Sequence, residues 1–91
     1  MPPPSPNSQP RFAAGCRWGT RAGEPVVLFP EGMIRVQGTG QSILELCDGQ
    51  RTVEEIVTAL SAKFEKADPE KISADVAKFL EALQQKRIVD Y

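Results

Sequence analysis

Apolar side chains in the second half of the chain recur every three or four positions, the spacing that places them on one face of an α-helix. Ile43, Leu46 and Cys47 follow this spacing. Asp48 and Gly49 come next and supply the stop that is common at a helix C-terminus. The pattern therefore predicts a short first helix that ends near Cys47, with the Cys47 side chain on its buried face.

Two further helices are indicated by their start signals. Thr52 and Glu55 match a capping box, in which each side chain accepts a hydrogen bond from the other residue's backbone N–H, so a second helix begins directly after Thr52. Asp68 followed by Pro69 is an N-cap with proline in the first helical position, and this third helix extends to about Lys86. Both helices carry an apolar stripe, which indicates that each packs one face on a core.

Between residues 16 and 37 the apolar positions change to a period of two, which is typical of strands. Turn-forming residues at 22–24 separate a first strand from the apolar run at 26–29. A second turn is predicted at 29–32, because proline in its second position and glycine in its fourth are the placement that favours a type I turn. A third strand follows over residues 33–37. Because hairpins order strands sequentially, this third strand lies at an edge that is open unless another segment covers it.

Three antiparallel strands followed by three helices place the chain in the α+β class, with a sheet and a helix pair arranged like a winged helix-turn-helix. We assign this domain to residues 11–91. Residues 1–10 contain five prolines and no apolar side chain after Met1, so they are expected to form a disordered tail. Ile88 and Val89 offer a short apolar end that is expected to fold back under the core.

Composition narrows the range of partners. The chain has 91 residues, of which 41% are hydrophobic and 25% charged, as expected for one small folded domain. The formal net charge is -1, and the helices mix lysines with acidic residues, so no nucleic-acid partner is expected. The longest apolar run, at 26–29, is too short to cross a bilayer, and the N-terminus lacks the regions of a signal peptide. We therefore expect a cytoplasmic protein with no membrane partner.

Reactive side chains are scarce. The chain has no histidine, and Cys16 and Cys47 are its only cysteines. Without an imidazole base or a C-x-x-C pair, the sequence predicts no catalytic residue, no metal site and no cofactor. We expect both thiols to be free and structural, and the protein not to be an enzyme.

One longer motif is specific enough to indicate a family. The run over residues 43–57, with the core L-C-D-G-x-R-T-V-E-E-I, resembles the PqqD family of pyrroloquinoline quinone (PQQ) biosynthesis. The segment 75–83 and the turn at 29–32 are also similar to that family. The resemblance covers about residues 10–89 and leaves only the proline-rich N-terminus outside it.

The chain departs from the family pattern in two places. Gln37-Gly38-Thr39 stands where the family usually has Leu-Asn after the third strand. Lys86-Arg87 precedes Ile88 where a glycine is usual. The first departure concerns the entry into the first helix, and the second concerns the C-terminal end of the third.

The resemblance implies a binding module without catalysis. PqqD-like domains adopt a winged helix-turn-helix fold and hold the precursor peptide PqqA for PqqE, a radical S-adenosylmethionine enzyme. The same domain type recognises leader peptides in other pathways that make modified ribosomal peptides. An exposed edge strand can accept an extended peptide as an added strand, with backbone hydrogen bonds giving affinity and side-chain pockets giving selectivity. The third strand is the edge that the sequence predicts for this role.

The resemblance also implies that the peptide lies between the third strand and the last long helix. Phe79 and Leu83 are then expected to be wall residues, and Asp75 a polar contact. The apolar positions can equally belong to the core, and that alternative stays open. The candidate peptide-binding residues are Met33, Ile34, Arg35, Val36, Gln37, Asp75, Phe79 and Leu83.

Two other functions remain open from the sequence. A diverged winged-helix regulator would bind duplex DNA with a steep salt dependence, whereas a peptide adaptor would ignore DNA at physiological salt. A homodimer interface as the main function is a third hypothesis. The mixed charge pattern favours the peptide adaptor.

Overall fold

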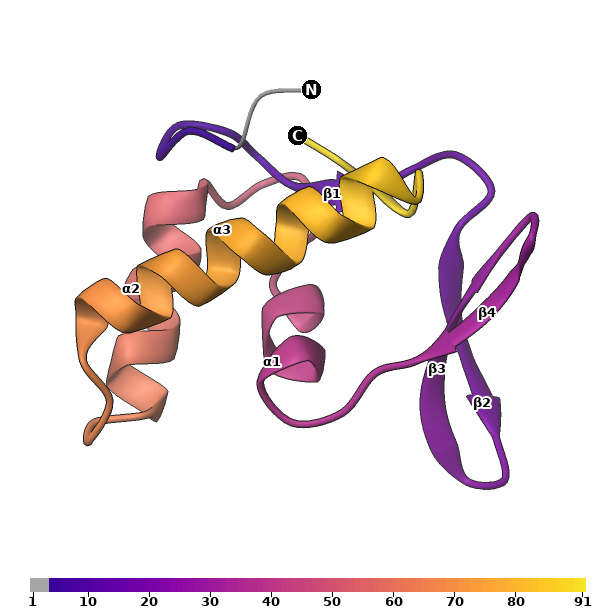
Figure 1. Ribbon diagram of the computed structural model, residues 1–91, viewed down its shortest axis with the longest axis horizontal. Coiled ribbons are helices and arrows are strands. Elements are labelled where there is room, and N and C mark those ends of the chain that lie inside the picture. The colour runs from indigo at the N-terminus through magenta and orange to yellow at the C-terminus, as the bar shows by residue number, and fades with distance from the viewer. Residues whose placement is uncertain (1–3) are drawn as a thin grey trace.

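The computed structural model describes residues 4–91, and an antiparallel three-stranded sheet precedes three helices in this range (Figure 1). The elements are β1 (Arg11–Phe12), β2 (Arg17–Arg21), β3 (Glu24–Phe29), β4 (Gly32–Arg35), α1 (Thr39–Glu45), α2 (Val53–Lys63), α3 (Pro69–Gln85) and β5 (Val89–Asp90). The predicted α+β class, with three antiparallel strands followed by three helices, is confirmed.

The three-stranded sheet has the order β2-β3-β4 and is built by two tight turns. Ala22 and Gly23 both have positive φ angles, 54° and 80°, which two-residue hairpin turns require. The second turn pairs Phe29 with Gly32, as the sequence predicts. The third strand ends at Arg35, so the prediction of a strand as far as residue 37 is too long by its last residues. The chain bends away to α1 through Gly38, whose φ is 61°.

The helix boundaries follow the signals in the sequence. The Glu55 N–H donates to Thr52 Oγ1 at 3.1 Å and the Thr52 N–H donates to Glu55 Oε1 at 3.0 Å, so the capping box at the start of α2 is confirmed. Asp68 Oδ1 accepts from the Glu70 N–H at 2.9 Å and caps α3. α1 ends at Glu45, slightly before the predicted end near Cys47.

The core lies mainly among the three helices and the C-terminal segment, with Val27 and Val36 contributed from the sheet side, and α3 packs against α2. In Figure 1, α3 runs across the molecule from orange to yellow, and its C-terminal end lies on the side of the sheet. Ile88 and Val89 have no exposed surface, which confirms that the C-terminus folds under the core. The pairing of β5 with β1 into a second, two-stranded sheet was not predicted. No helix within residues 4–91 has the length and apolar character needed to span a membrane.

The structure differs from the predicted disordered tail over residues 1–10. Residues 1–3 lie outside the described part of the chain. Pro10 is fully buried, and its carbonyl accepts a hydrogen bond from the Gly49 N–H at 2.9 Å. The segment before Pro10 lies against the start of α2.

Backbone carbonyls explain this attachment. The first N–H groups of a helix have no partner inside the helix. In α2 the Val53 N–H donates to Ser8 O at 2.8 Å, and the Glu54 N–H donates to Pro6 O at 3.1 Å. Composition predicts a tail because it counts apolar side chains, and it takes no account of carbonyl acceptors at a helix end.

Both cysteines in the described range are free thiols, and they differ in burial. Cys47 lies in the core and its Sγ–H donates to Ile43 O at 3.2 Å. Burial, reinforced by the charge of Asp48, raises the pKa of the Cys47 thiol from 9.0 to about 12. Cys16 is only half-buried, and burial together with Asp90 raises its pKa as well.

The free energy of unfolding is expected to fall as the pH rises above about 9. In that range the unfolded chain ionises Cys47 while the folded chain keeps its proton until the pH nears about 12. Below pH 9 both states carry the thiol, so this group adds no pH dependence there. Denaturant titrations at about pH 8 and about pH 10.5 measure the effect, whose limiting slope is about 1.4 kcal/mol per pH unit for one group.

Two variants identify the responsible thiol. Cys47→Ala is expected to be less stable at both pH values but to lose most of the alkaline decline. Cys16→Ala is expected to keep that decline because its thiol is more accessible to solvent. An equal alkaline decline in Cys47→Ala and in the parent chain would contradict this assignment.

Candidate functional site

The outer edge of β4 pairs with no other strand among residues 4–91. The Val36 N–H, just beyond the strand, donates to Pro25 O in the direction of β3 at 3.4 Å. Backbone groups of successive residues in an antiparallel strand point alternately to its two sides. The N–H and C=O groups of Met33 and Arg35 therefore point to the open edge, where an added strand can bind them.

The middle of α3 packs on the start of α1. The ring of Phe79 lies over Gly40, and a Cβ atom on Gly40 would be 3.0 Å from Phe79 Cε1. Near the beginning of β4, residues of the α3 C-terminus face the β3–β4 turn across a cleft. The cleft thus separates the β3–β4 turn from the C-terminal end of α3, whereas the middle of α3 packs on α1.

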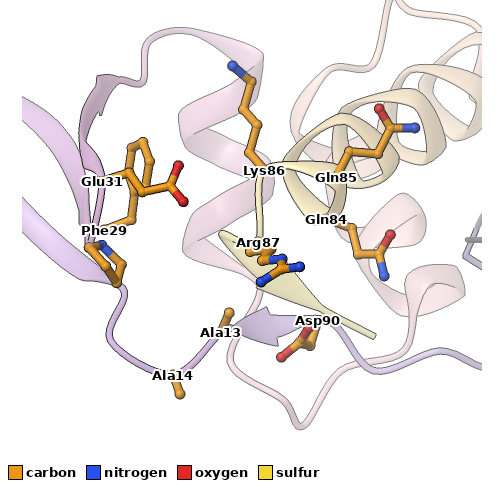
Figure 2. A pocket seen from close by; sticks show the side chains of 10 residues that line it. Ala13, Ala14, Phe29, Glu31, Gln84, Gln85, Lys86, Arg87 and Asp90 are labelled. Atoms are coloured by element: carbon orange, nitrogen blue, oxygen red, sulfur yellow. The ribbon is translucent and has the colours of Figure 1, made fainter.

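The cleft has a volume of about 730 Å³, which is within the range of sites that bind small molecules or short peptide segments. Its walls come from the β1–β2 connection, the β3–β4 turn and the C-terminal end of α3. The lining residues are Ala13, Ala14, Phe29, Pro30, Glu31, Gln84, Gln85, Lys86, Arg87 and Asp90. Figure 2 shows Phe29 and Glu31 on the sheet side and Gln84, Arg87 and Asp90 opposite them.

The side chains of the predicted edge residues lie on two faces of the sheet. Ile34 is half-buried and Val36 is 3% exposed, and both pack on the core. Met33, Arg35 and Gln37 are exposed, Met33 to 38%. The edge therefore offers its backbone to a partner, and Val36 belongs to the core.

The three predicted residues of α3 have different environments. Leu83 is 5% exposed and is a member of the core. Phe79 is half-buried and contacts the core from outside. Asp75 is exposed and lies beside Thr39 in a separate surface pocket near the start of α3. The structure thus places Phe79 against the start of α1 and Leu83 inside the domain.

None of the ten lining residues of the cleft was predicted as a site residue; Phe29, Glu31, Arg87 and Asp90 are among them. They come from a turn, a helix end and the chain terminus, which only the fold brings together. The sequence carries one signal for this cluster, since Arg87 stands where a glycine is expected after a helix. Within residues 4–91 no three His, Cys, Asp or Glu side chains gather in a way that could hold a metal ion.

Comparison with known proteins places this geometry in context. The family described as "Coenzyme PQQ synthesis protein D (PqqD)" matches residues 24–89. The "PqqA binding protein" of Kluyvera intermedia is 41% identical over 85 residues, which are 90% of this chain and 90% of that protein. The "PqqA binding protein" of Methylococcus capsulatus is 41% identical over 66 residues, 72% of this chain and 68% of that one.

Solved structures have the same fold. The PqqD truncation of Methylobacterium extorquens PqqCD, described as a functional and stand-alone recognition element for ribosomally synthesised and post-translationally modified peptides, superposes with a TM-score of 0.78. It is 31% identical, and the match covers 96% of this chain and 94% of that chain. TbiB1, solved with the TbiA(β) leader peptide, has a TM-score of 0.77 at 24% identity, covering 88% and 94%, and supports the fold alone. On the strength of the family match and these relatives, the chain belongs to the PqqD family.

Proposed function

We propose that this protein is a peptide-binding adaptor of PQQ biosynthesis that holds the precursor peptide PqqA and presents it to the radical S-adenosylmethionine enzyme PqqE. The observation that carries the proposal is the unpaired edge of β4, a strand that follows directly on the turn lining the cleft beside the α3 C-terminus. A peptide in extended conformation can add to this edge as a fourth strand. Its side chains then lie next to α3 and in the cleft.

The individual residues have distinct roles in this proposal. Met33 and Arg35 contribute their backbone groups, and Gln37 extends the edge beyond the strand. Ile34 and Phe79 supply half-buried apolar contacts. Asp75 provides a polar contact in the N-terminal half of α3. Val36 and Leu83 support the site from the core.

The relatives support this function. Proteins that match most of this chain are named for binding PqqA, and a solved relative is described as a recognition element for ribosomal peptides. The proposed role needs no catalytic residue, metal or cofactor in this chain, because the chemistry belongs to the partner enzyme. We infer that the adaptor acts in the cytoplasm, where ribosomal peptides are made. A diverged DNA-binding regulator has no comparable support.

An NMR titration of the ¹⁵N-labelled chain with a synthetic PqqA peptide tests the proposal. Amide signals of residues 33–37 and of residues 75–87, at α3 and its C-terminal end, are expected to shift, because the peptide forms hydrogen bonds with the first segment and packs on the second. Adding PqqE to this complex is expected to broaden the signals of chain and peptide together, as a ternary complex forms.

Two outcomes would contradict the proposal. Shifts confined to α2 or to residues 5–10 would place the peptide elsewhere on the domain. Duplex DNA serves as the comparison ligand, and specific shifts with DNA but none with the peptide, at physiological salt, would favour the regulator instead.

A further inference from the structure

The C-terminus of α3 ends in an unusual way. The Ile88 N–H donates to Leu83 O and the Arg87 N–H donates to Gln84 O, each at 2.9 Å. This pair of bonds is a Schellman motif, in which the residue after the C-cap takes a left-handed conformation and is usually glycine. Here that residue is Arg87, with φ at 60°. A residue with a Cβ atom is strained in this conformation.

The helix end itself does not need an arginine. Both bonds of the motif are made by backbone groups, so a glycine would form them with less strain. The Arg87 carbonyl accepts a weak hydrogen bond from Cys16 Sγ at 3.5 Å, which is again a backbone contact. The Arg87 guanidinium, in contrast, forms no hydrogen bond or ion pair with any of residues 4–91. No hydrogen bond or ion pair of the Arg87 side chain within residues 4–91 therefore offsets this strain.

The guanidinium lies at the cleft that the β3–β4 turn lines, directly before the open-edged strand β4. Figure 2 shows Arg87 between Glu31 on the sheet side and Asp90 on the C-terminal side, while Lys86 points away from them. Neither carboxylate is close enough to Arg87 to form an ion pair. The cleft thus holds an arginine head group with all five N–H donors available to a ligand.

We propose that Arg87 recognises an acidic side chain of the bound peptide and so selects which peptide segment occupies the cleft. This inference rests on the proposed peptide binding. A guanidinium matches a carboxylate with two parallel hydrogen bonds, which fix its position as well as its charge. Because Glu31 and Asp90 repel other acidic groups nearby, a peptide carboxylate gains energy only where it reaches Arg87 directly. The contact therefore sets the register of the peptide along β4.

The variant Arg87→Gly separates the two roles of this residue. It is expected to raise the melting temperature on the order of 4 °C because it relieves the left-handed strain. It is also expected to weaken binding of the PqqA peptide about tenfold, the loss typical of a charged hydrogen bond. A gain in stability together with a loss in binding is a result that a merely structural arginine would not give.

Two further variants isolate the charge. Arg87→Gln keeps a Cβ atom in the left-handed conformation, so it is expected to lose affinity without gaining stability. Arg17→Gln removes an exposed positive charge on β2, outside the lining of the cleft, and is expected to bind like the parent chain. Replacing each Asp and Glu of the peptide by Ala in turn is expected to reveal one position that weakens binding to the parent chain but not to Arg87→Gly.

The outcomes distinguish this inference from the proposed function. If the parent chain binds no PqqA peptide, both the proposed function and this inference are wrong. If the parent chain binds the peptide and Arg87→Gly binds it equally well, only the role of Arg87 is overturned. The same holds if every acidic position of the peptide gives the same loss with both chains, because no single carboxylate is then paired with Arg87.

Discussion

A proline at position 35 is expected to weaken binding of the PqqA peptide at least about tenfold while the domain stays folded. The Arg35 N–H points to the open edge of β4, so in the free protein it bonds only to water. Proline removes this donor. A peptide that adds to β4 would then keep one carbonyl without a partner, and the cost of that unpaired group is about 1–3 kcal/mol.

The position is chosen so that the fold tolerates the change. The backbone groups that bond to β3 belong to the residues on either side of Arg35, as the hydrogen bond from the Val36 N–H to Pro25 O shows. Ile34, which precedes the new proline, is already in an extended strand, the conformation that a residue before proline prefers. Circular dichroism and the melting temperature of Arg35→Pro are therefore expected to stay close to those of the parent chain.

Two variants serve as controls in the same titration calorimetry experiment. Arg35→Ala keeps the N–H and removes only the side chain, whose exposed ion pair with Glu24 at 3.6 Å contributes little, so near-parental binding is expected. Val36→Pro removes a bond to β3 and is expected to destabilise the sheet. If Arg35→Pro and Arg35→Ala bind the peptide equally, the peptide does not pair with β4 at this residue.

Local signals are sufficient to predict the helices and turns of this domain. A capping box at Thr52 and an N-cap at Asp68 predict where α2 and α3 begin, because the free N–H groups at a helix start favour side chains that can accept a hydrogen bond. The turn from Phe29 to Gly32 depends in the same way on its proline and glycine. The position of β4 at an edge follows from the order of the hairpins alone.

Such local signals do not predict contacts between segments that are distant in the sequence. β1 and β5 are each two residues long and lie at opposite ends of the chain, so neither has enough residues to show a period of two. The docking of Pro6 and Ser8 on α2 uses backbone carbonyls, which every residue type carries. Sequence patterns reflect the properties of side chains, so they cannot predict contacts that are made by the backbone.

The motif that carries the family resemblance builds the junction between α1 and α2. Asp48 Oδ1 accepts from the Gln50 N–H at 2.9 Å and the Arg51 N–H at 3.2 Å, and Arg51 Nη1 lies 2.6 Å from Asp48 Oδ2. These donors lower the pKa of Asp48, the Gln50 N–H most of all. Gly49 has a φ of 79°, which favours glycine at that position.

This junction contributes no residue to the cleft. A turn that fixes a carboxylate, a glycine and a helix cap constrains residue types at successive positions, and so it leaves a recognisable motif. An edge strand binds through backbone groups that any sequence provides. The family was therefore identified from the part of the chain that shapes the fold, whereas the proposed site had to be located from topology.

Truncation of Leu83 is expected to act on the fold rather than on peptide binding. Its side chain is 5% exposed and lies in the core, although the sequence placed it on the wall of the peptide site. Leu83→Ala is expected to reduce the free energy of unfolding by about 2–5 kcal/mol, the usual cost of such a cavity. In a domain of this size that lowers the melting temperature by about 10 °C or more.

Phe79→Ala is the matched comparison because the family resemblance implied the same role for both residues. Phe79 lies half-buried against Gly40, on the surface of the core. We expect this variant to lose less stability than Leu83→Ala and to lose peptide affinity by a larger factor. Thermal melts give the stabilities, and titrations at a temperature where both variants are fully folded give the affinities.

The comparison of the two variants decides which side of α3 faces the peptide. A helix can present Phe79 and Leu83 together, since residues four positions apart share a face, so only their burial separates them. If Leu83→Ala loses affinity more than Phe79→Ala at unchanged melting temperature, the peptide reaches a surface that the packed core now covers. α3 would then have to shift away from the core on binding, since Leu83 has almost no surface to offer in the free domain.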